Sequence, residues 1–149
     1  MHTFVIMVHV TAGSLGLLVG PAAMLVPKRP GRHPWLGRAY QGLTAALCLS
    51  AFGLVGYKPS LWWLGVIGAV TWAAALGGWW VRRRRFNGWL PWHIGLMCGS
   101  YISFATAFLV VNLGLGSPLA WIAPTVVGTP LIARATVRSL RPGLAVMRD

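Results

Sequence analysis

The sequence predicts an all-α integral membrane protein, a bundle of five transmembrane helices with its N-terminus outside and its C-terminus in the cytoplasm. The first observation is composition: 56% of the 149 residues are hydrophobic and only 9% are charged, whereas a soluble domain carries about a quarter charged residues. The second is a series of long apolar runs, and the third is the grouping of Lys and Arg at the ends of alternate runs. We interpret residues 1–149 as one transmembrane domain.

The five expected helices follow from the apolar runs, since a spanning helix needs about 20 mostly apolar residues. Four runs reach this length, at residues 3–26, 40–57, 61–81 and 92–115. The first has no positively charged segment before it, so we predict a retained helix and not a secretory signal. The fifth, at 119–137, contains two prolines, which membrane helices tolerate, and is long enough only if Arg134 reaches back to the interface. Four spans is the alternative.

Orientation follows from the positive charges, because cytoplasmic loops are enriched in Lys and Arg. With five spans, Lys58 is alone on one side, and the other 12 of the 13 Lys and Arg share the opposite side. A four-span chain would leave the C-terminal arginines outside. We therefore predict a multi-pass protein of the bacterial cytoplasmic (inner) membrane. The twelve are Lys28, Arg29, Arg32, Arg38, Arg82, Arg83, Arg84, Arg85, Arg134, Arg138, Arg141 and Arg148.

The near-absence of carboxylates excludes several classes of function. Asp149 is the only acidic residue, so the chain cannot supply the paired carboxylates of a glycosidase, the acid of a Ser-His-Asp triad, or an embedded acidic proton relay. We expect no enzyme. A strongly basic soluble protein would suggest nucleic-acid binding, but these charges flank apolar runs, so we expect lipid and no nucleic acid. Cys48 and Cys98 fall inside apolar runs and are predicted to pack in the core.

Small residues four apart predict where helices approach closely, because membrane helices associate through backbone contact. Tryptophans near the run ends, such as Trp79, Trp80 and Trp89, are typical of a membrane interface. The small-residue stripes predict a compact bundle, contact with a partner protein, or both. They are Gly16 and Gly20; Gly42, Ala46 and Ser50; Gly65, Ala69, Ala73 and Gly77; and Gly95, Gly99, Ser103 and Ala107.

His9 lies inside the first predicted helix, roughly 9 Å from its outer end, with Gly13, Gly16 and Gly20 below it. One interpretation is a ligand to haem b, with the glycines letting the macrocycle lie against the backbone. The other is a neutral imidazole that bonds to a hydroxyl or carbonyl of a neighbouring helix while the glycines mark a helix crossing. His2 belongs with His9 to an outer pair of histidines.

A second group of polar side chains is expected near the cytoplasmic interface. His33 lies in the predicted loop 27–39, and His93 lies at the start of the fourth helix. Such a group could hold a quinone head group, an anionic lipid head group, or a metal ion with Met97 as a weak third ligand. The lipid head group needs only the basic residues. The members are His33, Arg38, Tyr40, Gln41, His93, Met97 and Tyr101.

These residues also carry a family likeness. Their order and spacing resemble a bacterial family of predicted membrane proteins catalogued as domain of unknown function 2306. The resemblance implies a multi-span bundle and marks His9, His33 and His93. One departure is that Pro34 follows His33, where the family often has arginine. The matching positions are His9, Gly13, Gly20, Pro21 and Ala23; then His33, Gly37, Arg38 and Tyr40; then His93, Met97, Ser100 and Tyr101.

Three functions are compatible with the sequence. The first is a non-enzymatic accessory or scaffold subunit that packs against a larger membrane complex, for example a respiratory or photosynthetic one, or against itself. It would bind anionic lipids through Lys28, Arg29, Arg32, Arg38 and Arg82 to Arg85. The alternative is a small redox protein holding haem b or a quinone through His9 or the His33/His93 group. A transporter ranks last, because no carboxylate is embedded.

Overall fold

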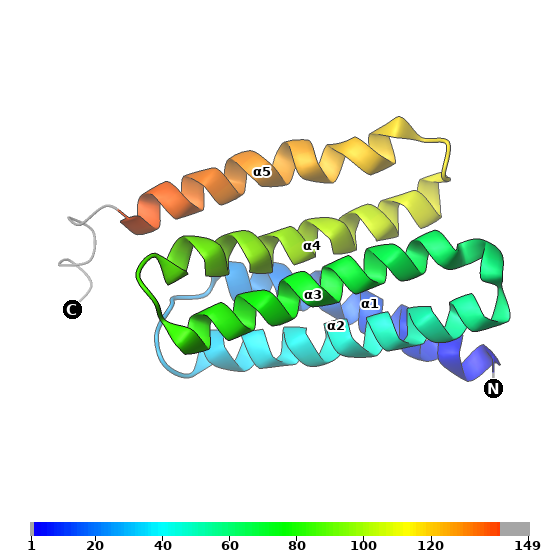
Figure 1. The fold of residues 1–149 in the computed structure, drawn as a ribbon, viewed down its shortest axis with the longest axis horizontal. Helices are drawn as coiled ribbons and strands as arrows, with labels where there is room; N and C mark the ends of the chain where they lie inside the picture. The colour runs from blue at the N-terminus through cyan, green and yellow to red at the C-terminus, as the bar shows by residue number, and fades with distance from the viewer. Residues whose placement is uncertain (1, 141–149) are drawn as a thin grey trace.

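The computed structural model describes residues 2–140 as five helices, with no strand in that range. They are α1 (His2–Leu25), α2 (Arg32–Tyr57), α3 (Trp62–Arg84), α4 (Trp89–Leu113) and α5 (Pro118–Leu140). A short 3₁₀ turn, η1 (Pro59–Leu61), precedes α3. The all-α prediction is confirmed. Successive helices run antiparallel along one long axis (Figure 1).

The first four helices form a closed ring in which α1 packs on α2, α2 on α3, α3 on α4, and α4 again on α1. Within the described part of the chain, α5 makes its backbone contacts with α4 and lies outside the ring (Figure 1). Its Trp121 ring also packs beside Trp63 of α3, with centroids 6.0 Å apart. The diagonal pairs of the ring, α1 with α3 and α2 with α4, make no close backbone contact. The interior of the ring is therefore filled by side chains from four helices.

Four helices, α1, α2, α3 together with η1, and α4, are long and apolar enough to cross a membrane. The structure therefore fits a multi-pass membrane protein. Helix α5 has 23 residues, but its C-terminal half carries Arg134 and Arg138. The expected fifth helix is present, and its crossing of the membrane stays a prediction.

The largest difference from the expected boundaries is at the start of α2, which begins at Arg32 and not at residue 40. The segment around His33 and Arg38 was predicted to be a loop, and this was wrong. Pro34 does not interrupt the helix, because a residue in the first turn has no intrahelical acceptor for its N–H. Helix α4 shows the same effect: it begins at Trp89, three residues before the predicted start, with Pro91 in its first turn.

The predicted glycine contacts of the first helix are confirmed. A Cβ atom at Gly16 would lie 2.6 Å from the Phe104 ring, and one at Gly20 would lie 2.5 Å from the Tyr101 ring. Both aromatic residues belong to α4, so these glycines let α1 meet α4 across the ring. The crossing of α1 and α4 therefore depends on the absence of side chains at these two positions.

The two glycines of the stripe predicted for the fourth helix do not mark a contact with the described residues. Nothing described lies within 4 Å of a Cβ built at Gly95 or Gly99. The buried residues of α4 are instead Ser100, Phe104, Thr106 and Val110. The spacing of small residues marks a helix face that another helix can approach closely. It does not say whether a helix of the same chain packs on that face. On α4 the small-residue face remains open.

Candidate functional site

Positive charge is concentrated at one end of the bundle, where α1, α3 and α5 finish and α2 and α4 begin (left in Figure 1). We call this the basic end and the opposite one the far end. Residues 2–140 contain no Asp or Glu, so no described cation has a carboxylate partner. Lys58 lies at the far end. Arg141, Arg148 and Asp149 lie outside the described residues. The basic end holds Lys28, Arg29, Arg32, Arg38, Arg82, Arg83, Arg84, Arg85, Arg134 and Arg138.

The four consecutive arginines at the end of α3 are not equivalent. Arg83 lies over the Trp79 ring at 4.3 Å from its centroid, Arg84 over Trp80 at 5.4 Å, and Arg85 over Trp89 at 6.0 Å. These are cation–π distances, typical of arginines held at a membrane interface. Arg82 has no such partner among the described residues. It is partly buried, while Arg83, Arg84 and Arg85 are exposed.

His33 bonds to the end of helix α1. Its Nδ1 lies 2.9 Å from the carbonyl oxygen of Ala23, so Nδ1 carries the proton and donates it. The Lys28 ammonium donates to the same oxygen at 2.9 Å and to the Met24 oxygen at 2.6 Å. The last carbonyls of a helix have no intrahelical donor, so both side chains cap α1. Partial burial lowers the pKa of the Lys28 ammonium.

His93 makes a similar bond to α3. Its Nδ1 donates to the carbonyl oxygen of Gly78 at 2.8 Å, and its ring packs beside Trp89 with centroids 6.0 Å apart. Gly78 permits this approach, because a Cβ there would lie 2.8 Å from Met97 Cγ and 3.2 Å from the Met97 backbone nitrogen. The position of His93 therefore depends on a glycine of the facing helix.

Four side chains from four different segments lie at the basic end, and we call them the inner cluster: Lys28, His33, Arg82 and His93. Lys28 and His33 bond to the same Ala23 carbonyl. Arg82 follows Gly78, whose carbonyl accepts from His93, by one helical turn. Lys28 and Arg82 are close enough for their charges to act on both imidazoles. Each imidazole has its Nδ1 held by a carbonyl, which leaves Nε2 free. The structure thus brings together the two inner histidines that the sequence singled out, and it adds two permanent cations.

This environment suits an anion better than a metal cation. In residues 2–140 no three His, Cys, Asp or Glu side chains are placed to hold a metal ion. Lys28 and Arg82 would also repel a cation bound at the histidines, since like charges in a partly desolvated site interact strongly. An anion would instead meet donors from both cations. The cluster can therefore recognise negative charge.

The two tyrosines of the predicted inner group form hydrogen bonds between helices inside the bundle. Tyr40 is buried and its hydroxyl donates to Ser100 Oγ at 3.1 Å, because Ser100 Oγ itself donates to the Met97 carbonyl. The Tyr101 hydroxyl donates to the Leu17 carbonyl of α1 at 3.1 Å. Both tyrosines therefore bind one helix to another.

Gln41 of α2 makes contacts with α3 and α4. Its Nε2 donates to the Ala75 carbonyl of α3 at 2.6 Å and lies 3.6 Å from Met97 Sδ of α4. Its Oε1 is buried and has no hydrogen-bond partner among the described residues. Arg38 is exposed on α2. Gln41 thus acts mainly as a link between α2, α3 and α4.

The interpretation of His9 as a polar link between helices is confirmed. Its Nδ1 lies 3.0 Å from Ser50 Oγ on α2. Ser50 Oγ donates to the Leu47 carbonyl at 2.8 Å, so the imidazole is the donor to Ser50. His2 does not join His9; its ring packs edge-on against Tyr57, with centroids 5.1 Å apart.

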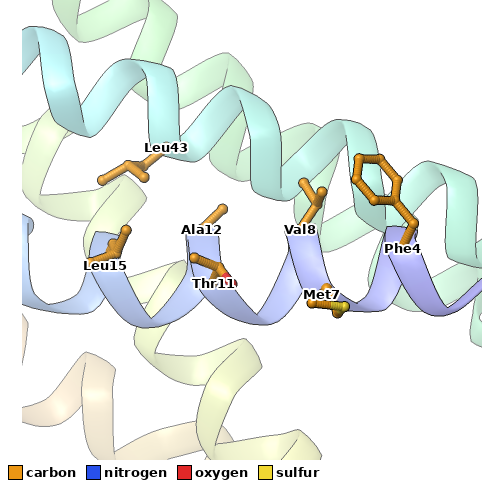
Figure 2. Close-up of a pocket in the computed structure, with 7 residues that line it drawn as sticks. All are labelled: Phe4, Met7, Val8, Thr11, Ala12, Leu15 and Leu43. Atoms are coloured by element: carbon orange, nitrogen blue, oxygen red, sulfur yellow. The ribbon is translucent and has the colours of Figure 1, made fainter.

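Two surface depressions lie away from the inner cluster. One, of about 370 Å³, is an apolar groove on the α1 face next to Leu43 of α2 (Figure 2). His9 is not among its lining residues. The second, of about 250 Å³, is lined by Pro91, Trp92, Gly95 and Leu96 on the open face of α4. Both are apolar, as expected of surfaces that face lipid or another helix. The residues of the groove are Phe4, Met7, Val8, Thr11, Ala12, Leu15 and Leu43.

Comparison of the chain with protein-family models, with curated proteins and with solved structures finds no match. The resemblance to domain of unknown function 2306 therefore stays a prediction.

Proposed function

We propose that this protein is a non-enzymatic scaffold or accessory subunit of the bacterial cytoplasmic membrane that binds anionic lipids through its basic end. The observation that carries the proposal is the grouping of ten Lys and Arg at one end of a chain segment that holds no carboxylate. The cytoplasmic leaflet is negatively charged and attracts such residues, at about 1 kcal/mol for each one near the surface. The basic end then faces the cytoplasm and the N-terminus lies outside.

Helix α5 is a fifth span in this proposal. It runs antiparallel to α4 along much of its length (Figure 1), and 23 residues of helix cover about 35 Å, enough for the hydrocarbon core. Its arginines, Arg134 and Arg138, lie at the same end as those of α3. Five spans place all the Lys and Arg of residues 2–140 except Lys58 on one side, in agreement with the positive-inside rule.

The role as a scaffold or subunit is supported by the open small-residue face of α4. Gly95 and Gly99 face no side chain of the described chain, and a depression beside them is lined by Trp92. Glycines four apart allow a second helix to approach the backbone closely. The partner in this proposal is another membrane subunit or a second copy of the chain.

The redox alternative would use the histidines as ligands or as quinone contacts. His9 donates its Nδ1–H to Ser50, a bond that is compatible with ligation through Nε2, whereas the inner histidines stand beside Lys28 and Arg82. The lipid interpretation uses these cations directly, so we prefer it. An absorption spectrum of the protein purified from its own membrane tests the alternative, since bound haem b gives a Soret band.

The lipid proposal is tested by reconstituting the protein in vesicles of phosphatidylcholine with rising fractions of phosphatidylglycerol. Tryptophan fluorescence is measured in a variant in which Trp62, Trp63 and Trp121 of the far end are replaced by Phe. Its quenching by brominated lipids of each class then measures which lipid surrounds the basic end. The proposal predicts preferential quenching by brominated phosphatidylglycerol and its loss at high salt, because exposed charges are screened. Equal quenching by the two lipids would contradict it.

A further inference from the structure

The geometry points to a discrete phosphate-binding site at the inner cluster, in which Arg82 and Lys28 bind the phosphate oxygens and His33 and His93 take up a proton when it binds. This inference rests on the proposed function, because it identifies one specific site within the basic end. It goes further in naming the chemical group recognised, the residues that hold it, and its dependence on pH.

The first argument concerns unused hydrogen-bond donors. Arg82 makes no hydrogen bond or cation–π contact with any described residue, although it is partly buried. Its three neighbours, in contrast, all lie on tryptophans. A guanidinium presents five N–H donors in a planar fork that fits two phosphate oxygens at once. Lys28 uses two of its three donors on Ala23 and Met24, so one remains for a ligand.

The second argument concerns charge. Lys28 and Arg82 are both within the influence of the two imidazoles, and no carboxylate in residues 2–140 offsets them. Arg82 is partly buried, and a partly buried cation without a counter-ion is unfavourable. A bound phosphate would supply the missing negative charge and accept the free donors, forming charge-assisted hydrogen bonds. A ligand that carries a phosphate group would therefore supply the missing negative charge.

The third argument concerns the histidines. Because each Nδ1 donates to a backbone carbonyl, the neutral ring offers only a lone pair at Nε2. Protonation turns Nε2 into a donor, and a nearby anion favours the protonated form. The groups that act on His33 are Lys28, Arg82 and His93, and those that act on His93 are Arg82 and Lys28. The positive charges of Lys28 and Arg82 disfavour a further positive charge on either ring, whereas a bound phosphate favours it, so protonation and phosphate binding are linked.

The phosphate could belong to a lipid head group or to a water-soluble compound. We use as probes glycerophosphoglycerol, which is a soluble phosphodiester head group, and short-chain phosphatidylglycerol, which adds acyl chains to the same group. A phosphodiester carries one fixed negative charge near neutral pH, so any pH dependence comes from the protein. Tighter binding of the lipid than of the head group identifies a lipid site, and equal binding identifies a soluble ligand.

The experiment is calorimetric titration of the full chain in an uncharged detergent with each probe. Arg82→Gln is expected to weaken binding by at least about tenfold, because a hydrogen bond to a charged group contributes about 1.5–3 kcal/mol. Arg83→Gln removes the same charge from the next position of the same helix and is the matched control. It is expected to weaken binding by less than about twofold, as for an exposed charge. Arg82→Lys is expected to recover only part of the affinity.

The proton linkage is tested by repeating the titration at about pH 5.5 and about pH 8, on either side of the ordinary histidine pKa. The wild-type protein is expected to bind about tenfold more tightly at the lower pH. In the double variant His33→Gln/His93→Gln this dependence should disappear, since glutamine keeps a donor for the carbonyl but takes up no proton. Size-exclusion chromatography confirms that each variant remains folded.

Equal losses for Arg82→Gln and Arg83→Gln would overturn the discrete site while leaving general lipid attraction by the basic end intact. A pH dependence unchanged in the double histidine variant would overturn the proton linkage. No preference for phosphatidylglycerol over phosphatidylcholine in any variant would overturn both this inference and the proposed function.

Discussion

The two ends of the bundle contain histidines in different surroundings. Towards the far end, His9 bonds to the hydroxyl of Ser50, and Lys58 is the only described cation. At the basic end, His33 and His93 bond to backbone carbonyls and stand beside Lys28 and Arg82. All three imidazoles are bonded through Nδ1, but only the two at the basic end lie close to cations of the described chain. The basic end retains unused donors and uncompensated charge, and this difference indicates where a ligand binds.

Different pairs of helices are held together in different ways. The contact between α1 and α4 depends on Gly16 and Gly20, in the half of α1 that leads to the basic end, because these glycines receive aromatic rings. At the basic end, side chains reach across to main-chain oxygens of a neighbouring helix: Gln41 to Ala75 and His93 to Gly78. Such bonds fix the rotation of α3 relative to α2 and α4. They therefore set which of four consecutive arginines faces the histidines.

The largest effect on stability is expected for Gly78→Ala. This variant tests whether the rotation of α3 against α2 and α4 is needed for a stable bundle and for phosphate binding. The new Cβ would lie 2.8 Å from Met97 Cγ and 3.2 Å from the Met97 backbone nitrogen, and α4 would have to move away. Overpacking of this kind costs about 1–3 kcal/mol. Thermal unfolding in detergent should show a lower midpoint, and phosphate binding should weaken together with it.

The control is Gly99→Ala on the open face of α4, where nothing described lies within 4 Å of the added Cβ. Alanine is a better helix former than glycine by about 1 kcal/mol in water, so the midpoint should stay the same or rise. A fall as large as that of Gly78→Ala would show that the Gly99 face is in contact with another chain in the sample.

A smaller effect is expected when His9 or His93 is replaced by alanine. Each change removes one interhelical hydrogen bond, worth about 0.6 kcal/mol on average in a membrane protein and at most about 2 kcal/mol. Stability should fall by similar amounts in both variants. Only His93→Ala should alter the pH dependence of phosphodiester binding. A changed pH dependence in His9→Ala would remove the distinction between the two ends.

Tyr40→Phe is expected to cost about 1 kcal/mol, because it removes the hydroxyl that donates to Ser100. Ser100 keeps its bond to the Met97 carbonyl, so no buried donor is left without a partner. Phosphate binding should not change, since the Tyr40 hydroxyl is bound within the core. If Tyr40→Phe lowered phosphate binding as well as stability, Tyr40 would belong to the phosphate-binding site.

The smallest effect is expected for Lys58→Gln at the far end. Lys58 is exposed and lies between the end of α2 and η1, at the opposite end of the bundle from the inner cluster, and exposed charges contribute at most about 1 kcal/mol. Both unfolding and lipid preference should be unchanged. A reduced preference for phosphatidylglycerol would mean that the far end also takes part in lipid binding.

The overall fold was predictable because its signals extend over long windows. Runs of about 20 apolar residues identify the helices, and the alternation of Lys and Arg places their ends. Local features were predicted less well. The starts predicted at residues 40 and 92 came too late, because apolar runs do not register a first turn that holds polar residues or a proline, and a proline there interrupts no hydrogen bond. Four identical arginines carry no sequence signal that separates Arg82 from Arg83; only the packing of α3 decides which one faces the histidines.

The most direct test of the account is the side of the membrane on which each end lies. A green fluorescent protein fused after the chain should fluoresce, since it folds in the cytoplasm. Cysteine introduced at Ser60, in the turn next to Lys58, should react with a membrane-impermeant maleimide applied from outside, on a background in which Cys48 and Cys98 are replaced by Ala. A dark fusion together with a Ser60→Cys protein labelled only after lysis would place the basic end outside and contradict the account.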